Sequence, residues 1–392
     1  MSLFSLALAA FLPLAPQARG AEPVSFGEDR VDVPAALRKA KAASVAFPDV
    51  SGAPIAKAQA PRPKPPTNFS HDATPAEIKA AVERNADNHL PKGVKSPFRP
   101  VEDTAAFAYV LMSAYEQGSE VPNLRKTIAS NLPAGVRLVI LADADEADRV
   151  RKKYLKWLPA ERLIIATDEY TGNGFWARDA FPVPVYDDSS KKASLVAAHY
   201  YRDFTSWDAV ASSVNGPIAK KGFTFVGGNL LADEDGTCFA IDSYRLFTVT
   251  PQDLTGAYGC KTVHIMPHVH GIGDVDEVLK PLPGKRMLTN TVEYKESLES
   301  WGYQLVWLPH LKEAYRTYAN ALIVRDTVFM PAYNVPADQE ARQVFESLGY
   351  QVFPIPTVDL SDDLHGSIHC QTMAYPPMPK QALLKALRLV EL

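Results

Sequence analysis

Short apolar runs alternate with amphipathic segments from about residue 101 to the end of the chain, and this pattern predicts strands that alternate with helices. The run over residues 136–141 is apolar at nearly every position, as in a strand covered on both faces, and a helix is expected over 144–157. Further strands are expected near 163–166, 195–200, 222–226, 286–288, 304–308, 321–330 and 351–354. The chain is therefore predicted to be an α/β protein.

Within this region, two segments match each other at an offset of 47 residues. Residues 299–304 and 346–351 both read Glu-Ser-x-Gly-Tyr-Gln, and each predicts the end of a helix, a glycine stop and the start of a strand. A repeat of this period leaves room for about five or six modules after residue 100. We therefore expect a ring or array of ββαβ-like units rather than two separate domains.

Residues 21–100 have a different pattern, because they contain 12 of the chain's 32 prolines, including the run Pro61–Pro66. This proline density predicts a linker or an arm that follows the surface. One helix interrupts it, since Thr74-Pro75-Ala76-Glu77 is a capping box with proline at the first helical position. This helix is expected to run to about Asn88.

The first residues resemble an export signal. Residues 3–15 are apolar, too short a run to span a bilayer, and Ala18-Arg19-Gly20 is a small-x-small pattern that favours cleavage before Ala21. No Lys or Arg precedes the apolar run, which is atypical. We predict a signal peptide over 1–20, an extension over 21–100, a catalytic domain over 101–392, and a secreted or periplasmic protein without a membrane span.

Charge and composition narrow the function. The chain is 46% hydrophobic and 22% charged, with a net charge of −4, and its longest basic run is Arg151–Lys153. This composition gives no electrostatic footprint for nucleic acid, but it suits a cationic small substrate.

The three cysteines raise a question of chemistry. Cys238 and Cys260 are 22 positions apart and could form a disulfide, which would leave Cys370 unpaired in an exported protein. Such a thiol is either a small buried hydrophobe or a reactive group.

Five polar motifs stand near the ends of predicted strands. They are Phe175-Trp-Ala-Arg-Asp-Ala-Phe-Pro182, Val226-Gly-Gly-Asn229, Gly271-Ile-Gly-Asp-Val-Asp276, Tyr318-Ala-Asn320 and Gly366-Ser-Ile-His-Cys-Gln-Thr-Met373. In their order and spacing over about residues 130–375 they resemble the guanidine-modifying enzymes of the pentein superfamily. Agmatine deiminases and Porphyromonas-type peptidylarginine deiminases are the most similar branch.

The resemblance implies a five-bladed α/β propeller with a central active site. It also implies that Asp179 and Asp276 grip the guanidinium group, that Cys370 is the nucleophile and that Asn320 lines the substrate channel. Trp176 is a candidate to stack on the planar cation. The expected substrate is agmatine-like or peptidyl-arginine, and we expect no cofactor and no metal.

These residue types suit the chemistry. A guanidinium carbon is a poor electrophile, so a thiolate is a suitable attacking group. Two carboxylates that bind the guanidinium nitrogens would hold the carbon over the sulfur. Loss of ammonia would leave a thiouronium intermediate that water converts to a ureido product.

The chain departs from the family pattern at two positions. Asp274 stands where the family has the histidine that donates a proton and activates water, and Val226 stands where the family tends to have glutamate. We predict that Asp274 takes over the catalytic role, because three neighbouring carboxylates can raise one pKa toward neutrality. His369 is not expected to help, because neighbours on a strand point to opposite faces. His268 and His270 share a face and could reach the site through a loop.

Other interpretations stay open at this point. Asp179 could pair with Arg178, Asp276 could cap a loop, Asn320 could hold a turn, and Gly227-Gly228 suits a tight backbone turn. His264, His268, His270 and Asp274 could together form a zinc site. The alternative to a deiminase is a module that binds arginine or other guanidino ligands without turnover.

Overall fold

The computed structural model describes residues 72–86, 88–168, 174–190, 192–196, 198–199 and 223–392. The predicted signal peptide and most of the proline-rich extension lie outside these residues. Among the described residues, no helix is long and apolar enough to cross a bilayer.

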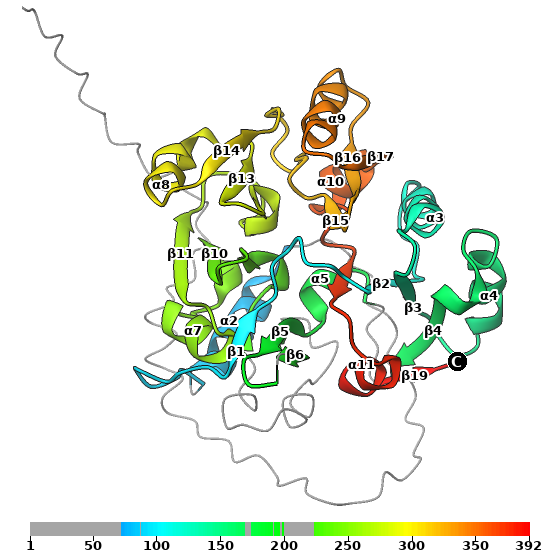
Figure 1. Cartoon of the computed structure of the whole chain (residues 1–392), viewed down its shortest axis with the longest axis horizontal. Coiled ribbons are helices and arrows are strands. Elements are labelled where there is room, and N and C mark those ends of the chain that lie inside the picture. The colour runs from blue at the N-terminus through cyan, green and yellow to red at the C-terminus, as the bar shows by residue number, and fades with distance from the viewer. Residues whose placement is uncertain (1–71, 87, 169–173, 191, 197, 200–222) are drawn as a thin grey trace, which may run out of the picture.

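Helices and strands alternate through the described chain, as the pattern predicts (Figure 1). The helices are α2 Pro75–Asn85, α3 Val121–Asn131, α4 Ala147–Tyr154, α5 Ala177–Ala180, α7 Pro251–Tyr258, α8 Lys295–Ser300, α9 Ala337–Ser347, α10 Val358–Leu364 and α11 Lys380–Ala386, with 3-10 helices η1 Ala160–Arg162, η2 Gly227–Asn229, η3 Tyr244–Leu246, η4 Val275–Glu277 and η5 Val292–Tyr294. The first strands are β1 Phe98–Pro100, β2 Tyr109–Ser113, β3 Arg137–Leu141, β4 Leu163–Asp168, β5 Val183–Asp187, β6 Ala193–Val196, β7 Ala198–His199, β8 Phe223–Thr224, β9 Leu231–Ala232 and β10 Thr237–Asp242. They are followed by β11 Thr262–Pro267, β12 Leu279–Leu282, β13 Arg286–Thr289, β14 Gln304–Trp307, β15 Leu322–Val324, β16 Thr327–Ala332, β17 Gln351–Pro356, β18 Met373–Tyr375 and β19 Leu389–Glu391.

The predicted ββαβ repeat is confirmed in three modules: β9-β10-α7-β11, β12-β13-α8-β14 and β15-β16-α9-β17. In each, the first two strands are antiparallel, and the third pairs in parallel with the second after the helix crosses over. The glycines of the two matching segments, Gly302 and Gly349, have φ of +86° and +93°. Both stop their helices in a left-handed conformation that glycine adopts without strain.

A five-stranded sheet in the order β18-β2-β3-β4-β19 brings the two ends of the region 101–392 together. Its part β18-β2-β3 has the pairing of a module, antiparallel and then parallel, with the first strand supplied from near the C-terminus. The sheets lie around α5 in Figure 1. No sheet of the described residues closes on itself.

Two boundaries differ from the sequence prediction. The capping box at Thr74 is present, but α2 ends at Asn85 rather than near Asn88. The Asn85 amide donates to the carbonyls of Thr224 and Phe247 and so ties the end of α2 to the core. The single strand expected over 321–330 is two strands, because Arg325 has φ of +58° and turns the chain back on itself.

The end of the extension belongs to the packed structure. Ala81 and Val82 of α2 are 1% exposed and lie in the same apolar cluster as Phe98, and β1 pairs with β5. Cys238 and Cys260 of this cluster form the disulfide that their spacing allows, and Cys370 is free and buried.

Candidate active site

The repeat determines where the candidate residues stand. Five of the polar segments directly precede the first strand of a pair or module: α5 before β5, η2 before β9, η4 before β12, Asn320 before β15 and the Cys370 turn before β18. Helix α5 contacts η2, and η2 contacts η4. Equivalent positions of successive modules therefore bring residues far apart in sequence to one place.

Backbone contacts hold these segments together. The Arg178 amide of α5 donates to the Cys370 carbonyl at 3.1 Å. A Cβ atom on Gly227 would lie 2.1 Å from the Arg178 carbonyl oxygen, so only glycine allows η2 to pack this closely on α5. The side chain of Asn229 accepts from the amides of Ile241 and Val275, and so fixes η4 to β10.

The sulfur of Cys370 has polar neighbours although the residue is fully buried. Asn320 Nδ2 lies 3.1 Å from the sulfur, and Asp276 Oδ2 lies 3.8 Å from it. Asn320 Oδ1 also accepts from the His369 amide at 3.1 Å, so this residue holds the turn that presents the sulfur. Burial, reinforced by Asp276, Asp179 and Glu277, raises the pKa of the Cys370 thiol well above its ordinary value.

The two predicted guanidinium-binding carboxylates converge over Gly228. A Cβ atom there would lie 3.1 Å from Asp276 Oδ2 and 3.2 Å from Asp179 Oδ1. Asp179 Oδ1 accepts from the Gly228 amide at 2.9 Å. Asp276 Oδ1 is buried and has no hydrogen-bond partner among the described residues. The site thus has an unsatisfied anionic acceptor on a carboxylate that also contacts the sulfur.

Asp274 is bound to Arg245. Its Oδ1 accepts from Arg245 Nε at 2.6 Å. Arg245 also faces Asp179, at 3.7 Å, so one cation serves two carboxylates. Burial raises the pKa of Asp274 to about 8, Asp179 adds to this, and Arg245 opposes it. The pKa is raised as predicted, but burial rather than the neighbouring carboxylates is the largest cause.

The expectation for His369 is wrong. Residues 368–371 form a turn rather than a strand, so His369 and Cys370 do not point to opposite faces. His369 Nδ1 lies 2.6 Å from Asp276 Oδ2, the same oxygen that approaches the sulfur. Its Nε2 lies 2.9 Å from Asp103 Oδ1.

Asp103 and Arg245 are functional candidates that sequence reasoning missed. Asp103 is nearly buried and also accepts from Lys280 Nζ at 2.6 Å. Burial alone would raise the pKa of Asp103, but Lys280, His369 and Arg178 outweigh it and hold that pKa far below its ordinary value. A lysine or arginine within an otherwise apolar or strand-forming run, such as Lys280 or Arg245, is a weak sequence signal that a buried carboxylate pairs with it.

Many ionisable side chains are buried around the site. The carboxyl groups are Asp103, Asp179, Asp274, Asp276 and Glu277, and the cations are Arg178, Arg245 and Lys280. Burial raises the pKa of Glu277 as well as that of Asp274, so these two carboxyl groups favour the neutral form, and Asp179 and Asp276 are the carboxylates that converge over Gly228.

The zinc alternative is not supported. Among the described residues, no group of three or more His, Cys, Asp or Glu side chains could hold a metal ion. His264 stacks on Trp301 at 3.6 Å, His268 Nε2 faces backbone carbonyls, and Asp274 is bound to Arg245. His268 Nε2 lies 3.1 Å from the His270 and Gly271 carbonyl oxygens, and His270 Nε2 lies 3.4 Å from Thr291 Oγ1.

Trp176, the predicted stacking residue, precedes α5 and is 3% exposed. Its ring packs edge-on against Phe175 at 4.9 Å, within the apolar cluster that also contains Cys370.

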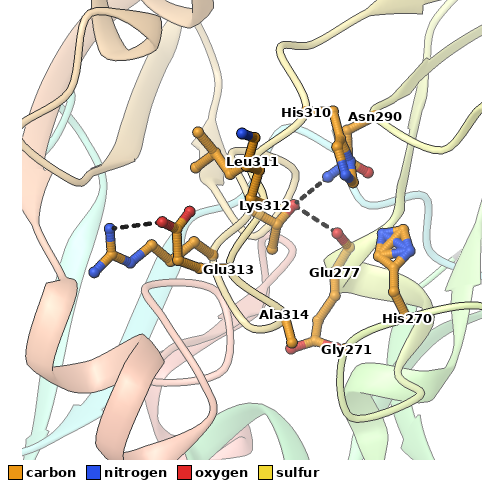
Figure 2. A pocket seen from close by; sticks show the side chains of 11 residues that line it. His270, Gly271, Glu277, Asn290, His310, Leu311, Lys312, Glu313 and Ala314 are labelled. Atoms are coloured by element: carbon orange, nitrogen blue, oxygen red, sulfur yellow. Dashed lines mark hydrogen bonds and ion pairs between the residues drawn. The ribbon is translucent and has the colours of Figure 1, made fainter.

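A pocket of about 190 Å³ adjoins the site. Glu277, which follows Asp276, lies in its wall with His270, His310 and Asn290 (Figure 2). Thr317 Oγ1 donates to the Glu277 carbonyl at 2.6 Å and accepts from Asn290 Nδ2. The pocket therefore reaches the residue next to Asp276.

Comparisons with known proteins agree with the motifs. Residues 286–376 match the family model of Porphyromonas-type peptidyl-arginine deiminase, and this segment contains Asn320 and Cys370. No curated protein sequence matches the chain.

Several solved structures share the fold. Agmatine deiminase of C. jejuni is 14% identical, with a TM-score of 0.56 over 75% of this chain and 100% of that one. Agmatine deiminase of Enterococcus faecalis is 15% identical, with a TM-score of 0.56 over 74% and 99%. A candidate arginine deiminase of Porphyromonas gingivalis is 21% identical, with a TM-score of 0.53 over 71% and 98%. The predicted resemblance is therefore confirmed: the chain has the α/β fold of the pentein deiminases, and its residues 286–376 match the Porphyromonas-type peptidyl-arginine deiminase family.

Proposed function

We propose that the protein is a hydrolase that deiminates a guanidino group, with Cys370 as the nucleophile. One observation carries this proposal. Asp276 presents one oxygen 3.8 Å from the sulfur and a second oxygen that is buried without a hydrogen-bond partner among the described residues. A buried unpaired acceptor is costly, and a guanidinium N–H would satisfy it beside the attacking atom.

The reaction follows from this placement. Asp179 and Asp276 bind the guanidinium nitrogens, and the bound cation lowers the pKa of the Cys370 thiol, which is otherwise raised by burial and by negative neighbours. The thiolate attacks the guanidino carbon, a carbon–nitrogen bond breaks, and ammonia leaves with an added proton. Water then attacks the thiouronium carbon, which releases the ureido product and regenerates the thiolate.

Asp274 is our candidate for the proton donor. Its pKa of about 8, raised by burial, keeps it a neutral acid at neutral pH, which is the form a donor requires. Its hydrogen bond to Arg245 orients one oxygen, and the other is buried without a partner among the described residues.

The substrate class is peptidyl-arginine or an agmatine-like amine. The Asp179 and Asp276 carboxylates that converge over Gly228 suit a cation, and the pocket beside Glu277 offers space for the rest of the substrate. We further propose that the sheets that follow the five site-bearing segments are the blades of a five-bladed propeller and that the protein is exported. The Cys238–Cys260 disulfide supports an oxidising compartment.

A second candidate function is guanidino binding without turnover. The raised pKa of Cys370 favours the unreactive thiol, and Asp274 contacts Arg245 rather than the sulfur. Calorimetry separates the two, because saturable heat without product supports binding alone.

The test is incubation of purified protein with agmatine and with arginine-containing peptides. A deiminase releases ammonia and leaves ureido groups, and Cys370→Ala abolishes both. If the wild type forms no more product than Cys370→Ala, the proposal of a hydrolase is rejected.

A further inference from the structure

The imidazole of His369 is clamped between two carboxylates. Nδ1 lies 2.6 Å from Asp276 Oδ2, and Nε2 lies 2.9 Å from Asp103 Oδ1. The residue is fully buried, and its backbone amide is held by Asn320. The chemistry proposed above assigns no role to this ring.

Both contacts require donors on the ring when the carboxylates are ionised. A carboxylate oxygen only accepts, so a ring that bonds to two carboxylates donates from both nitrogens and carries a positive charge. Asp103 is firmly ionised, since Lys280 Nζ lies 2.6 Å from its Oδ2 and Arg178 Nη1 lies 3.9 Å from its Oδ1. The ring thereby links Asp276 to a fixed anionic anchor.

The contact with His369 fixes the orientation of the Asp276 carboxylate. With Oδ2 bound to the ring, the carboxylate cannot rotate freely, and Oδ1 is left for a ligand. A carboxylate that is already held in one orientation loses less conformational freedom when a guanidinium binds.

We infer that His369 is a positioning residue for guanidinium recognition: it acts through Asp276, whose carboxylate it orients, with Asp103 as its anchor. This inference rests on the proposed function, because it assumes that Asp276 binds the guanidino group. It differs from a purely structural role, in which the ring only connects two parts of the core.

Two substitutions separate these roles, because each retains one of the two donors. The amide nitrogen of Asn occupies a position like that of Nδ1, so His369→Asn keeps the donor toward Asp276. The amide nitrogen of Gln reaches a position like that of Nε2, so His369→Gln keeps the donor toward Asp103. Both are made in a Cys370→Ser background, where dissociation constants for agmatine and N-acetylarginine amide are measured by calorimetry without turnover.

We expect His369→Gln to weaken binding of the recognised ligand about tenfold or more, the usual effect of losing a hydrogen bond to a charged group. His369→Asn should bind within about threefold of the parent. His89→Gln is the matched control, because His89 Nδ1 lies 2.8 Å from Asp253 Oδ2 in another His–Asp pair. It should bind like the parent.

The outcomes are distinct. If His369→Gln binds as tightly as the parent, or more tightly than His369→Asn, the inference is overturned while the proposed function stands. If the parent binds neither ligand, the proposed function fails and the inference fails with it. Should both His369 variants unfold, Asp103→Asn provides the decision, since it leaves the Asp276–His369 contact in place. Weakened binding then supports the inference, and unchanged binding contradicts it.

Discussion

All three cysteines are buried, but the two in the disulfide and the one in the Cys370 turn have different surroundings. Cys238, on β10, and Cys260, after α7, are at most 1% exposed and are bonded to each other within an apolar cluster. Cys370 is also fully buried, but its sulfur faces the amide of Asn320 and the carboxylate of Asp276.

This difference shows that burial alone does not identify a structural cysteine. The disulfide closes one module, since it joins the middle strand of β9-β10-α7-β11 to the segment before its last strand. Cys370 stands where several modules meet and has polar neighbours from two of them. The polar neighbours, rather than the exposed area, distinguish the sulfur that we propose as the nucleophile.

The largest expected effect separates the two regions directly. Cys370→Ser should lower turnover at least about 1,000-fold, because the nucleophile is lost, while changing the free energy of unfolding by less than about 1 kcal/mol. Ammonia release and denaturant titration measure the two quantities. Turnover that persists in this variant would contradict the assignment of the nucleophile.

The opposite result is expected for the disulfide. Replacing both Cys238 and Cys260 by Ser should lower the free energy of unfolding by about 3 kcal/mol, because the bridge closes a loop of moderate length. Turnover at 25 °C should stay within about twofold of the wild type, since a folded module still presents its site residues. A loss of turnover without loss of stability would contradict the assignment of a purely structural role to the disulfide.

A third test concerns the proton that we propose Asp274 donates to the leaving ammonia. Asp274→Asn should lower kcat about 100-fold, equivalent to about 2.7 kcal/mol, because an amide cannot donate the proton. In the wild type, the rate should fall as pH rises through about 8, where Asp274 ionises, and this decline should be absent in the variant.

Stability provides an independent measurement of the same shift. The folded protein keeps the Asp274 proton up to about pH 8, whereas the unfolded chain releases it near the ordinary value of 3.8. The wild type should therefore lose stability as pH rises between these values, and Asp274→Asn should lose less. Equal slopes for the two proteins would contradict the raised pKa.

The smallest expected effect tests where the cation binds. Gly228→Ala places a methyl group 3.1 Å from Asp276 Oδ2 and 3.2 Å from Asp179 Oδ1, where it crowds the space between the carboxylates. Guanidino ligands should bind about tenfold more weakly, about 1.4 kcal/mol, as measured by calorimetry in the Cys370→Ser background. Unchanged binding would place the cation elsewhere.

Much of the fold followed from local patterns. The Glu-Ser-x-Gly-Tyr-Gln repeat predicted the ββαβ module because a glycine stop between a helix and a strand is a local feature. The ordered motifs also predicted that Asp179, Asp276 and Cys370 share one site. The turn at Arg325 was missed although Arg325, Asp326 and Thr327 are three consecutive polar residues that interrupt the apolar run.

The anchors of the site could not be predicted in this way. Asp103 meets His369 across 266 residues of sequence, and no local period relates the two. His369 itself was rejected because its segment was read as a strand, and the turn conformation brings it to Asp276 instead. Such contacts depend on how the modules pack, which a single sequence pattern does not contain.

The most direct test of the central claim is mass spectrometry of protein quenched in acid during incubation with agmatine or an arginine peptide. The account predicts an adduct equal to the substrate minus ammonia on the peptide that contains Cys370, and no adduct in Cys370→Ser. Substrate turnover without any adduct on Cys370, together with equal turnover in Cys370→Ser, would contradict the claim that this sulfur attacks the guanidino carbon.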